Sequence, residues 1–308
     1  MMPMDDPADD DPYAAHLAST SMEVMLDSGA YSAWKSGTVI DVHQYGDFVE
    51  RNHEWIHDFA NLDVIPTGTS ADDAETAAQQ SWDNLKALER RGLEPIPVFH
   101  IGERWYWLEK LINEGYTTIG LGGVADLHRA ARKKWFDQVF SRLADEHGEC
   151  PVRLHGFGVT DSELLDSYPF YSGDSQTWIA IASNHEVMIP QITPTTIDYS
   201  RGRRVKILQK RDGELLFSNT AEGDYLASLG ATLEGIQSDY KVRRRVNAAF
   251  YRELGRQIGV KLYLVGVIAD GIFLDDANVR RRLISFSGLK SEKPDALEQY
   301  VTSRRKAE

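Results

Sequence analysis

The chain has 308 residues, of which 42% are hydrophobic and 10% aromatic, as is typical of a folded protein with one large domain. Its single cysteine, Cys150, excludes an intramolecular disulfide and a zinc site built from several thiolates. The net charge of −13 disfavours a polyanionic partner, but residues 1–150 carry 27 acidic and 12 basic side chains, whereas residues 151–308 carry 20 and 22.

Residues 1–20 are expected to form a flexible acidic leader. The stretch MMPMDDPADDDPY is acidic where a signal peptide is basic, and the chain has no apolar run of the length that crosses a membrane. These features predict a cytoplasmic protein that does not bind a membrane.

After the leader, short apolar runs alternate with amphipathic segments. The runs are short, have a strand-like composition and are closed by Gly, Asp or Ser, which predicts buried parallel strands. They are residues 22–26, 62–66, 94–102, 117–125, 152–159 and 168–175.

Helical periodicity fills the segments between these runs. Asp41 and Ser70 are predicted N-caps, and Gly92 is a predicted helix stop. The predicted helices lie within residues 40–60, 70–92, 104–115 and 127–148. Strands and helices that alternate at this spacing predict an α/β protein with a (β/α)8, TIM-like barrel.

The alternation is less regular beyond residue 180. Residues 185–190 and 261–271 read as strands, 221–258 as helical, and an Asp-Gly turn in 204–219 predicts a β-hairpin insertion. We therefore predict a barrel domain at 21–285 with an insertion around 195–258 and helical C-terminal additions. A basic tail is predicted at 286–308.

The carboxyl ends of barrel strands form the active face, so the residues at those ends are candidates for chemistry. Asp27 and Asp174 are each followed by a serine and then by an aromatic residue, Tyr31 or Trp178. Taken singly, each Asp is more often a turn residue. As a pair in one cleft, they suit a nucleophile and a general acid or base, and the aromatic rings suit stacking.

Further strand-end candidates are His100 in FHIGE, the glycines of GLGGVA, and His155, Gly156 and Gly158 in HGFGV. Adjacent glycines let a ligand approach the backbone, but they equally serve tight packing. A histidine there is likewise more often a core or rim residue than a catalyst.

Basic residues cluster in the second half of the chain, at 201–204, 241–245, 280–282 and 304–306. One such cluster is usually a solvated helix face. Four together predict a nucleic-acid surface. The candidate phosphate contacts are Arg203, Arg204, Arg243, Arg244 and Arg245.

Four segments resemble, in the same order, motifs of the tRNA-guanine transglycosylase superfamily. DSGAYS resembles DSGGFQ, GLGGVA resembles GGLA, HGFGV resembles an MGVG-type strand, and SGDSQTW resembles the segment around the nucleophilic aspartate. The closest likeness is to the 7-deazaguanine DNA transglycosylases of viruses and bacteria, whose PVFH-G and EGY-IALGG patterns resemble PVFHIG and EGYTTIGLGG here.

The resemblance implies an enzyme that exchanges guanine in DNA for a free 7-deazaguanine base and so protects viral DNA from restriction. Asp174 would be the nucleophile at C1′, and Asp27 the general base for the incoming base. No cofactor and no metal is expected. The base pocket would contain Ser28, Asp63, His100, Gly122, Gly123, Val124, Tyr31 and Trp178.

The sequence also departs from the tRNA-acting members, because it lacks the three cysteines of their structural zinc site. Three alternatives stay open at this stage. The protein is a tRNA-guanine transglycosylase, a catalytically silent barrel that binds nucleic acid, or a glycosidase or nucleosidase that uses the paired acids.

Overall fold

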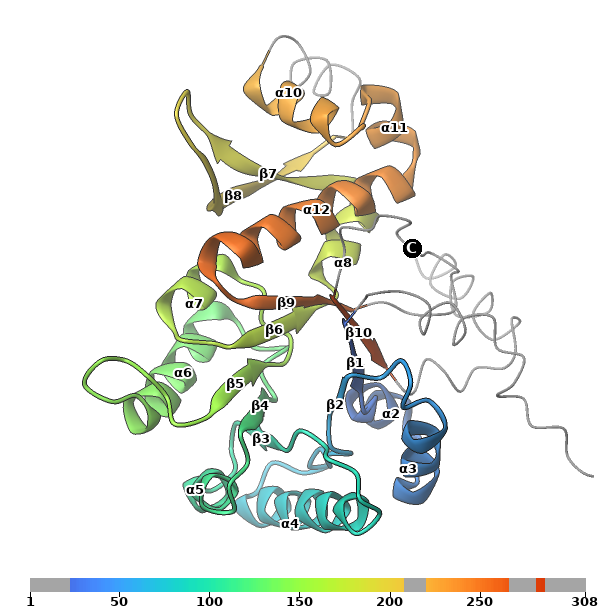
Figure 1. The fold of residues 1–308 in the computed structure, drawn as a ribbon, viewed down its shortest axis with the longest axis vertical. Coiled ribbons are helices and arrows are strands. Elements are labelled where there is room, and N and C mark those ends of the chain that lie inside the picture. The colour runs from blue at the N-terminus through green and yellow to red at the C-terminus, as the bar shows by residue number, and fades with distance from the viewer. Residues whose placement is uncertain (1–22, 208–219, 266–280, 286–308) are drawn as a thin grey trace, which may run out of the picture. The chain divides into compact units, whose positions relative to one another are not determined.

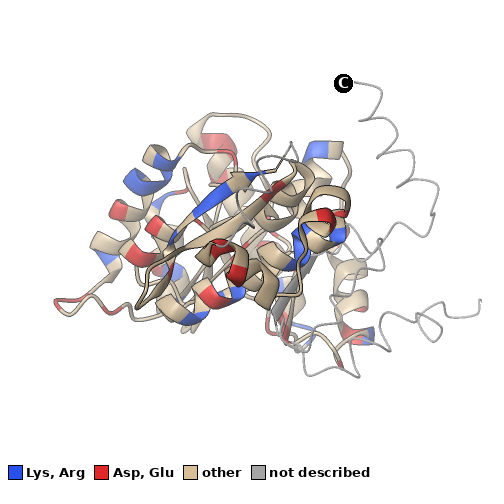
Figure 2. Cartoon of the chain, turned by 90° about the horizontal axis from the view of Figure 1, so that it is seen from above, with Lys and Arg blue, Asp and Glu red and all other residues tan. Residues whose placement is uncertain are grey.

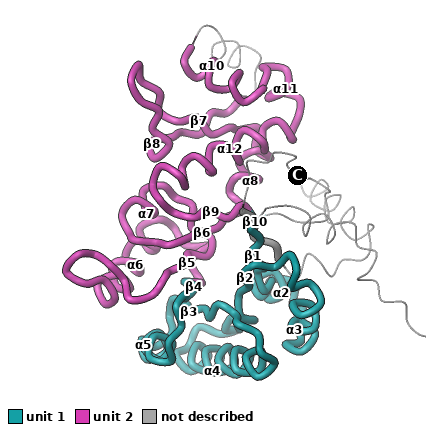
Figure 3. The backbone as a smooth tube through the Cα atoms, viewed as in Figure 1, with its two compact units in different colours: residues 1–121, 265–273, 280–308 teal, residues 122–264, 274–279 magenta. Residues whose placement is uncertain are grey.

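The computed structural model describes residues 23–207, 220–265 and 281–285, and in them helices alternate with mainly parallel strands (Figure 1). The protein is therefore of the α/β class. Its chain divides into two compact units (Figure 3). The described part of unit 1 is 23–121, 265 and 281–285, and that of unit 2 is 122–207 and 220–264. The predicted leader and basic tail lie outside the described residues, and the barrel domain at 21–285 stays a prediction.

Unit 1 contains a parallel sheet in the order β10-β1-β2, formed by β1 (Glu23–Asp27), β2 (Asp58–Phe59) and β10 (Arg281–Ser285). β3 (Val98–His100) and β4 (Thr118–Gly122) neighbour each other. The helices are α2 (Ala30–Ser36), α3 (Val42–Arg51), α4 (Ala71–Glu89) and α5 (Trp105–Asn113).

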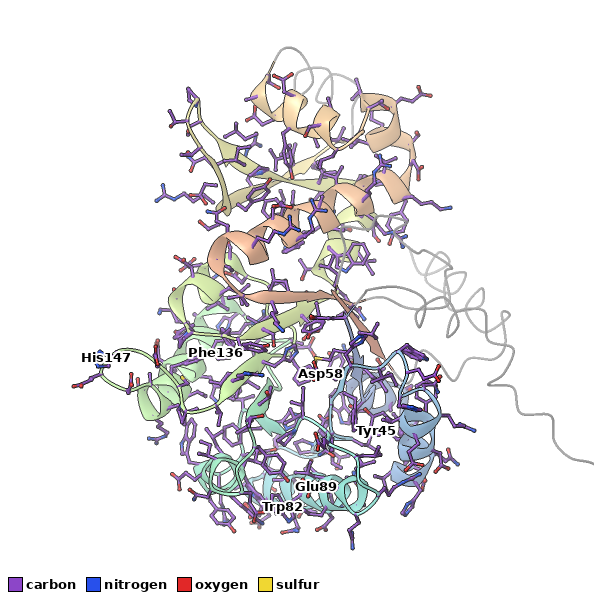
Figure 4. All side chains as sticks on the ribbon, in the orientation of Figure 1. Tyr45, Asp58, Trp82, Glu89, Phe136 and His147 are labelled. Carbon is purple, nitrogen blue, oxygen red and sulfur yellow. The ribbon has the colours of Figure 1, made fainter. Side chains whose placement is uncertain are left out.

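Both predicted helix caps in unit 1 are confirmed. Asp41 accepts hydrogen bonds from the backbone N–H groups of His43 and Gln44, and Ser70 forms a capping box with Asp73. The amphipathic face of α3 buries Tyr45, which Figure 4 labels, and Val49. These side chains join a core with Val24, Leu26, Trp55, Phe59, Leu62 and Leu88.

One predicted strand in unit 1 is wrong. Residues 62–66 form no strand, because the pairing to β1 ends earlier, where the Ala60 N–H donates to the Leu26 carbonyl at 2.8 Å. The turn residues after Asp27 lead into α2, a helix that begins after Gly29 and ends before Gly37. Both glycines have the positive φ that suits this residue type.

Unit 2 contains three parallel strands in the order β5-β6-β9, namely β5 (Arg153–Gly156), β6 (Ser172–Ser175) and β9 (Lys261–Leu264). A separate antiparallel pair joins β7 (Glu186–Ile192) to β8 (Ile197–Lys206). The helices are α6 (Arg129–Leu143), α7 (Ser162–Ser167), α8 (Thr177–Ser183), α10 (Ala221–Ser228), α11 (Leu233–Ser238) and α12 (Tyr240–Ile258).

The predicted strand at 185–190 exists, but β8 pairs with it in an antiparallel sense, so it is no parallel barrel strand. Residues 204–206 of the hairpin predicted at 204–219 lie in a strand, at the end of β8, which pairs with β7. Its Asp-Gly turn lies outside the described residues.

Basic and acidic residues both occur along the helices (Figure 2). Within the described ranges, no helix is long and apolar enough to cross a membrane. The predicted cytoplasmic location stays a prediction.

Candidate active site

Four polar side chains of unit 1 form a chain of hydrogen bonds at the carboxyl ends of β1 and β3 and in the segment after β2. The Ser28 hydroxyl donates to Asp63 Oδ1 at 2.9 Å, and His100 Nε2 lies 2.9 Å from Asp63 Oδ2. His100 Nδ1 lies 3.0 Å from Glu103 Oε1. We call Ser28, Asp63, His100 and Glu103 the Asp63 cluster.

Two carboxylates hold His100 in its charged form. Burial alone lowers the pKa of His100, but hydrogen bonds and charges from Asp63 and Glu103 outweigh it and raise the pKa from 6.5 to about 10. Both ring nitrogens are used in these contacts. The predicted direct contact of His100 with a base is therefore not available in this arrangement, and His100 instead orients Asp63.

Asp27 is the last residue of β1 and is partly buried. Burial raises the pKa of the Tyr45 phenol well above 10, and the negative charges of Asp27 and Asp63 raise this pKa further. The Tyr45 hydroxyl donates to the Ala60 carbonyl at 2.7 Å. Both acids therefore act on the same buried ring.

Asp174 lies at the carboxyl end of β6 in unit 2 and is 6% exposed. Its Oδ1 accepts from the Gly158 N–H at 3.0 Å and contacts His155 Nε2 at 3.2 Å. Among the described residues, Oδ2 receives no hydrogen bond. We call Asp174, His155, Ser172 and Gly158 the Asp174 cluster. Its geometry fixes the carboxylate through one oxygen and leaves the other for a ligand.

His155 also contacts the Ser172 hydroxyl, at 2.8 Å from Nδ1. A carboxylate can only accept, so the His155 tautomer that fits both contacts donates from Nε2 to Asp174 and accepts from the Ser172 hydroxyl at Nδ1. A Ser-His-Asp chain of this kind can activate a serine. Here Ser172 lies two residues before Asp174 on the same face of β6, one layer further from the carboxyl end. Asp174 is therefore the better placed nucleophile.

The two clusters belong to different units, with Asp27 in unit 1 and Asp174 in unit 2. That these two carboxylates face each other stays a prediction. Within the described ranges, no group of three His, Cys, Asp or Glu side chains has the arrangement of a metal site.

Other predicted pocket residues have mixed surroundings. Gly122 ends β4 and is buried, whereas Gly123 is exposed with φ 79°. Val124 is fully buried, and its carbonyl accepts from the Leu127 N–H at 3.0 Å. Tyr31 is 36% exposed on α2, where it stacks on Trp34 with 6.1 Å between ring centroids.

The prediction that Trp178 offers a stacking surface is wrong for this conformation. Trp178 is 2% exposed, and its ring packs inside unit 2 on the guanidinium of Arg244. Its position in the first turn of α8 turns the indole towards α12.

The predicted basic surface is wrong for two of its five arginines. Arg243 and Arg244 are 4% and 3% exposed, because they lie on the inner face of α12. Arg243 donates to the carbonyls of Ala182, Ile236 and Gln237. Arg203 and Arg204 are exposed on β8, and the half-buried Arg245 donates to the Gly230 carbonyl at 3.0 Å.

Two residues gained a role only from the structure. Glu103 follows His100 by three residues in a loop, and a His-x-x-Glu spacing was its only signal in the sequence. His155 is recognisable in the sequence as a strand-end residue. Its two partners lie on the next strand, and the register between two strands does not follow from the sequence of either one.

Comparison with protein-family models, with curated proteins and with solved structures gives no match to this chain.

Proposed function

We propose that the protein is a transglycosylase that exchanges guanine in DNA for a 7-deazaguanine base on a (β/α)8-type barrel. The observation that carries the proposal is the state of Asp174, a strand-end carboxylate held through Oδ1 by His155 and the Gly158 N–H. A nucleophile needs this combination of a fixed orientation and an oxygen that is not engaged.

The proposed reaction has two displacements at one carbon. Asp174 Oδ2 attacks C1′ of a deoxyguanosine, a C–O bond forms, and the N-glycosidic bond breaks as guanine leaves with the bonding electrons and takes up a proton from water. Asp27 then removes the ring N–H proton of the 7-deazaguanine, whose nitrogen attacks C1′ and releases Asp174. Two inversions give net retention, as in glycosidases with a carboxylate nucleophile.

The Asp63 cluster supports a role in base recognition. Guanine presents two neighbouring N–H donors on its pairing edge, and a carboxylate is the acceptor that suits both. Ser28 and His100 each engage one oxygen of Asp63 and fix its plane, while further lone pairs remain to accept. DNA must present the guanine outside the stack for these contacts, as other base-modifying enzymes require.

The two aspartates have separable tests. Asp27→Asn should release about one guanine per enzyme and then stop with DNA covalently attached, because the first displacement does not use Asp27. Asp58→Asn is the matched control, since Asp58 is an exposed acid on the neighbouring β2 (Figure 4). Repeated turnover by Asp27→Asn would contradict the base assignment.

A competition assay separates DNA from tRNA as the substrate. Equal concentrations of guanine-containing DNA and of tRNA are offered with one labelled 7-deazaguanine, and the label is expected in DNA. Label in tRNA alone would replace the DNA assignment with the tRNA alternative.

A further inference from the structure

Arg244 is a buried cation that forms no salt bridge with another described residue. Its side chain lies between the rings of Tyr240 and Trp178, with centroid distances of 4.9 and 5.8 Å, and is 3% exposed. Its Nε and Nη2 are both buried and have no hydrogen-bond partner in the described part of the chain. The neighbouring Arg243, by contrast, has three backbone carbonyls as acceptors.

Ring contacts alone do not compensate this burial, because a cation–π contact stabilises a guanidinium by less than its desolvation costs. Buried guanidinium groups are for this reason normally paired with an acceptor. An anion at Arg244 would supply the compensation that the described residues do not.

The unpartnered atoms also define a geometry. Nε and Nη2 form one edge of the planar guanidinium, and their two N–H bonds run nearly parallel, as needed to bind two oxygens of one phosphate or carboxylate. Neither donor of this edge has a partner among the described residues. The edge therefore has the pair of donors that one oxyanion needs.

The helix that carries Arg244 is fixed to its neighbours by Asn247. Asn247 lies one turn after Arg244 on the same face of α12 and is fully buried. Its amide donates to the Trp178 carbonyl at 3.2 Å and accepts from the Met188 N–H at 2.8 Å. These bonds tie α12 to α8 and β7, and α8 begins three residues after Asp174.

We propose that Arg244 is the binding residue of an oxyanion site that takes a phosphate group beside the segment following Asp174. The identity of the ligand rests on the proposed function: the phosphate belongs to the backbone of the DNA strand that Asp174 attacks. The site differs from the exposed basic surface expected from the sequence, because one desolvated arginine, and not a field of surface charges, makes it.

Inorganic phosphate is the first probe, titrated into the full chain at constant ionic strength while the melting temperature is followed. The wild type should show a saturable rise, and Arg244→Met should lose it, with phosphate affinity reduced at least tenfold. Arg256→Met is the control that keeps the rise, since Arg256 is exposed and paired with Glu253.

The phosphate-free arm separates binding from packing. Without phosphate, Arg244→Met should melt no lower than the wild type, because methionine is of similar size to arginine and the substitution removes an unpaired buried charge. A wild type without a saturable response, a response kept in Arg244→Met, or an equal loss of stability with and without phosphate would overturn the site. If Arg244→Met does not fold, Arg244→Lys keeps the charge, lacks the two-donor edge and should still weaken phosphate binding tenfold.

A short single-stranded oligodeoxynucleotide distinguishes the two sources of phosphate. Affinity for it that falls at least tenfold in Arg244→Met supports the DNA backbone as the ligand. Unchanged affinity beside a lost response to inorganic phosphate overturns the DNA part and leaves a free-phosphate site. Neither result depends on base exchange, so failure of the proposed reaction and failure of this site are seen in different measurements.

Discussion

Asp63, in the segment after β2, and Asp174, at the end of β6, differ in how they are held. Asp63 has a partner on each oxygen, Ser28 and His100, whereas the bonds to Asp174 converge on Oδ1. A carboxylate fixed on both sides suits recognition, and one fixed on a single side suits attack on carbon. The chemistry assigned to each therefore follows from its hydrogen bonds.

Asp174→Asn and Ser172→Ala test which member of the Asp174 cluster reacts. Loss of the nucleophile should reduce the exchange rate on the order of 10⁴-fold or more. Ser172→Ala removes one hydrogen bond, worth roughly 1 kcal/mol, and should change the rate less than about tenfold. Asp166→Asn, an exposed acid on α7, is the control. A dead Ser172→Ala with an active Asp174→Asn would reverse the assignment.

The Asp63 cluster predicts a pH dependence of stability. The pKa of His100 is raised from 6.5 to about 10, so the folded state holds its proton more tightly than the unfolded state. The stabilisation is complete below pH 6.5 and is lost as the pH rises through about 10. Chemical denaturation of wild type and His100→Gln should show a difference that shrinks over this interval. The exposed His53→Gln is the control, and a difference independent of pH would contradict the charged state of His100.

At the scale of elements, the turn after β5 packs directly on β6. A Cβ built on Gly173 clashes with the Val159 carbonyl, and Gly158 adopts a positive φ of 73° in the same turn. This close approach is what brings the Gly158 N–H within reach of Asp174. Glycine at position 173 is therefore part of the geometry of the nucleophile.

Gly173→Ala should move the turn away from β6 and disorient Asp174. We expect a loss of about 1–3 kcal/mol of stability from overpacking, and a loss of activity of about 100-fold from misplacement of the nucleophile. Gly148→Ala, in an exposed turn with nothing near its Cβ, should keep activity. Full activity in Gly173→Ala would show that the Gly158 contact is dispensable.

Much of the element order was predictable, because helix caps and buried strands are local signals. The capping of α3 and α4 and the strands β1, β3 to β6 and β9 follow from such signals. The burial of Arg243 and Arg244 could not be predicted from such signals, since a run of three arginines on a helix does not reveal which of them faces the core. Strand pairing was not predictable either, and the contact between His155 and Asp174 depends on it.

At the scale of the whole molecule, a net charge of −13 makes any DNA binding depend on local basic groups. Arg203 and Arg204 are the exposed members of the predicted surface. Their joint replacement by Gln should weaken DNA binding and reduce the slope of log affinity against log salt by about 1 per lost phosphate contact. Arg256→Gln is the control and should leave the slope unchanged. An unchanged slope in the double variant would show that Arg203 and Arg204 do not contact DNA phosphates.

Base exchange itself is tested most directly by mass spectrometry of the nucleosides in DNA that has been incubated with the full chain and a panel of free 7-deazaguanines. The account predicts a new 7-deaza-deoxyguanosine in the DNA and an equal amount of free guanine, both absent with Asp174→Asn. Unmodified DNA with every base in the panel, or equal exchange by Asp174→Asn, would contradict it.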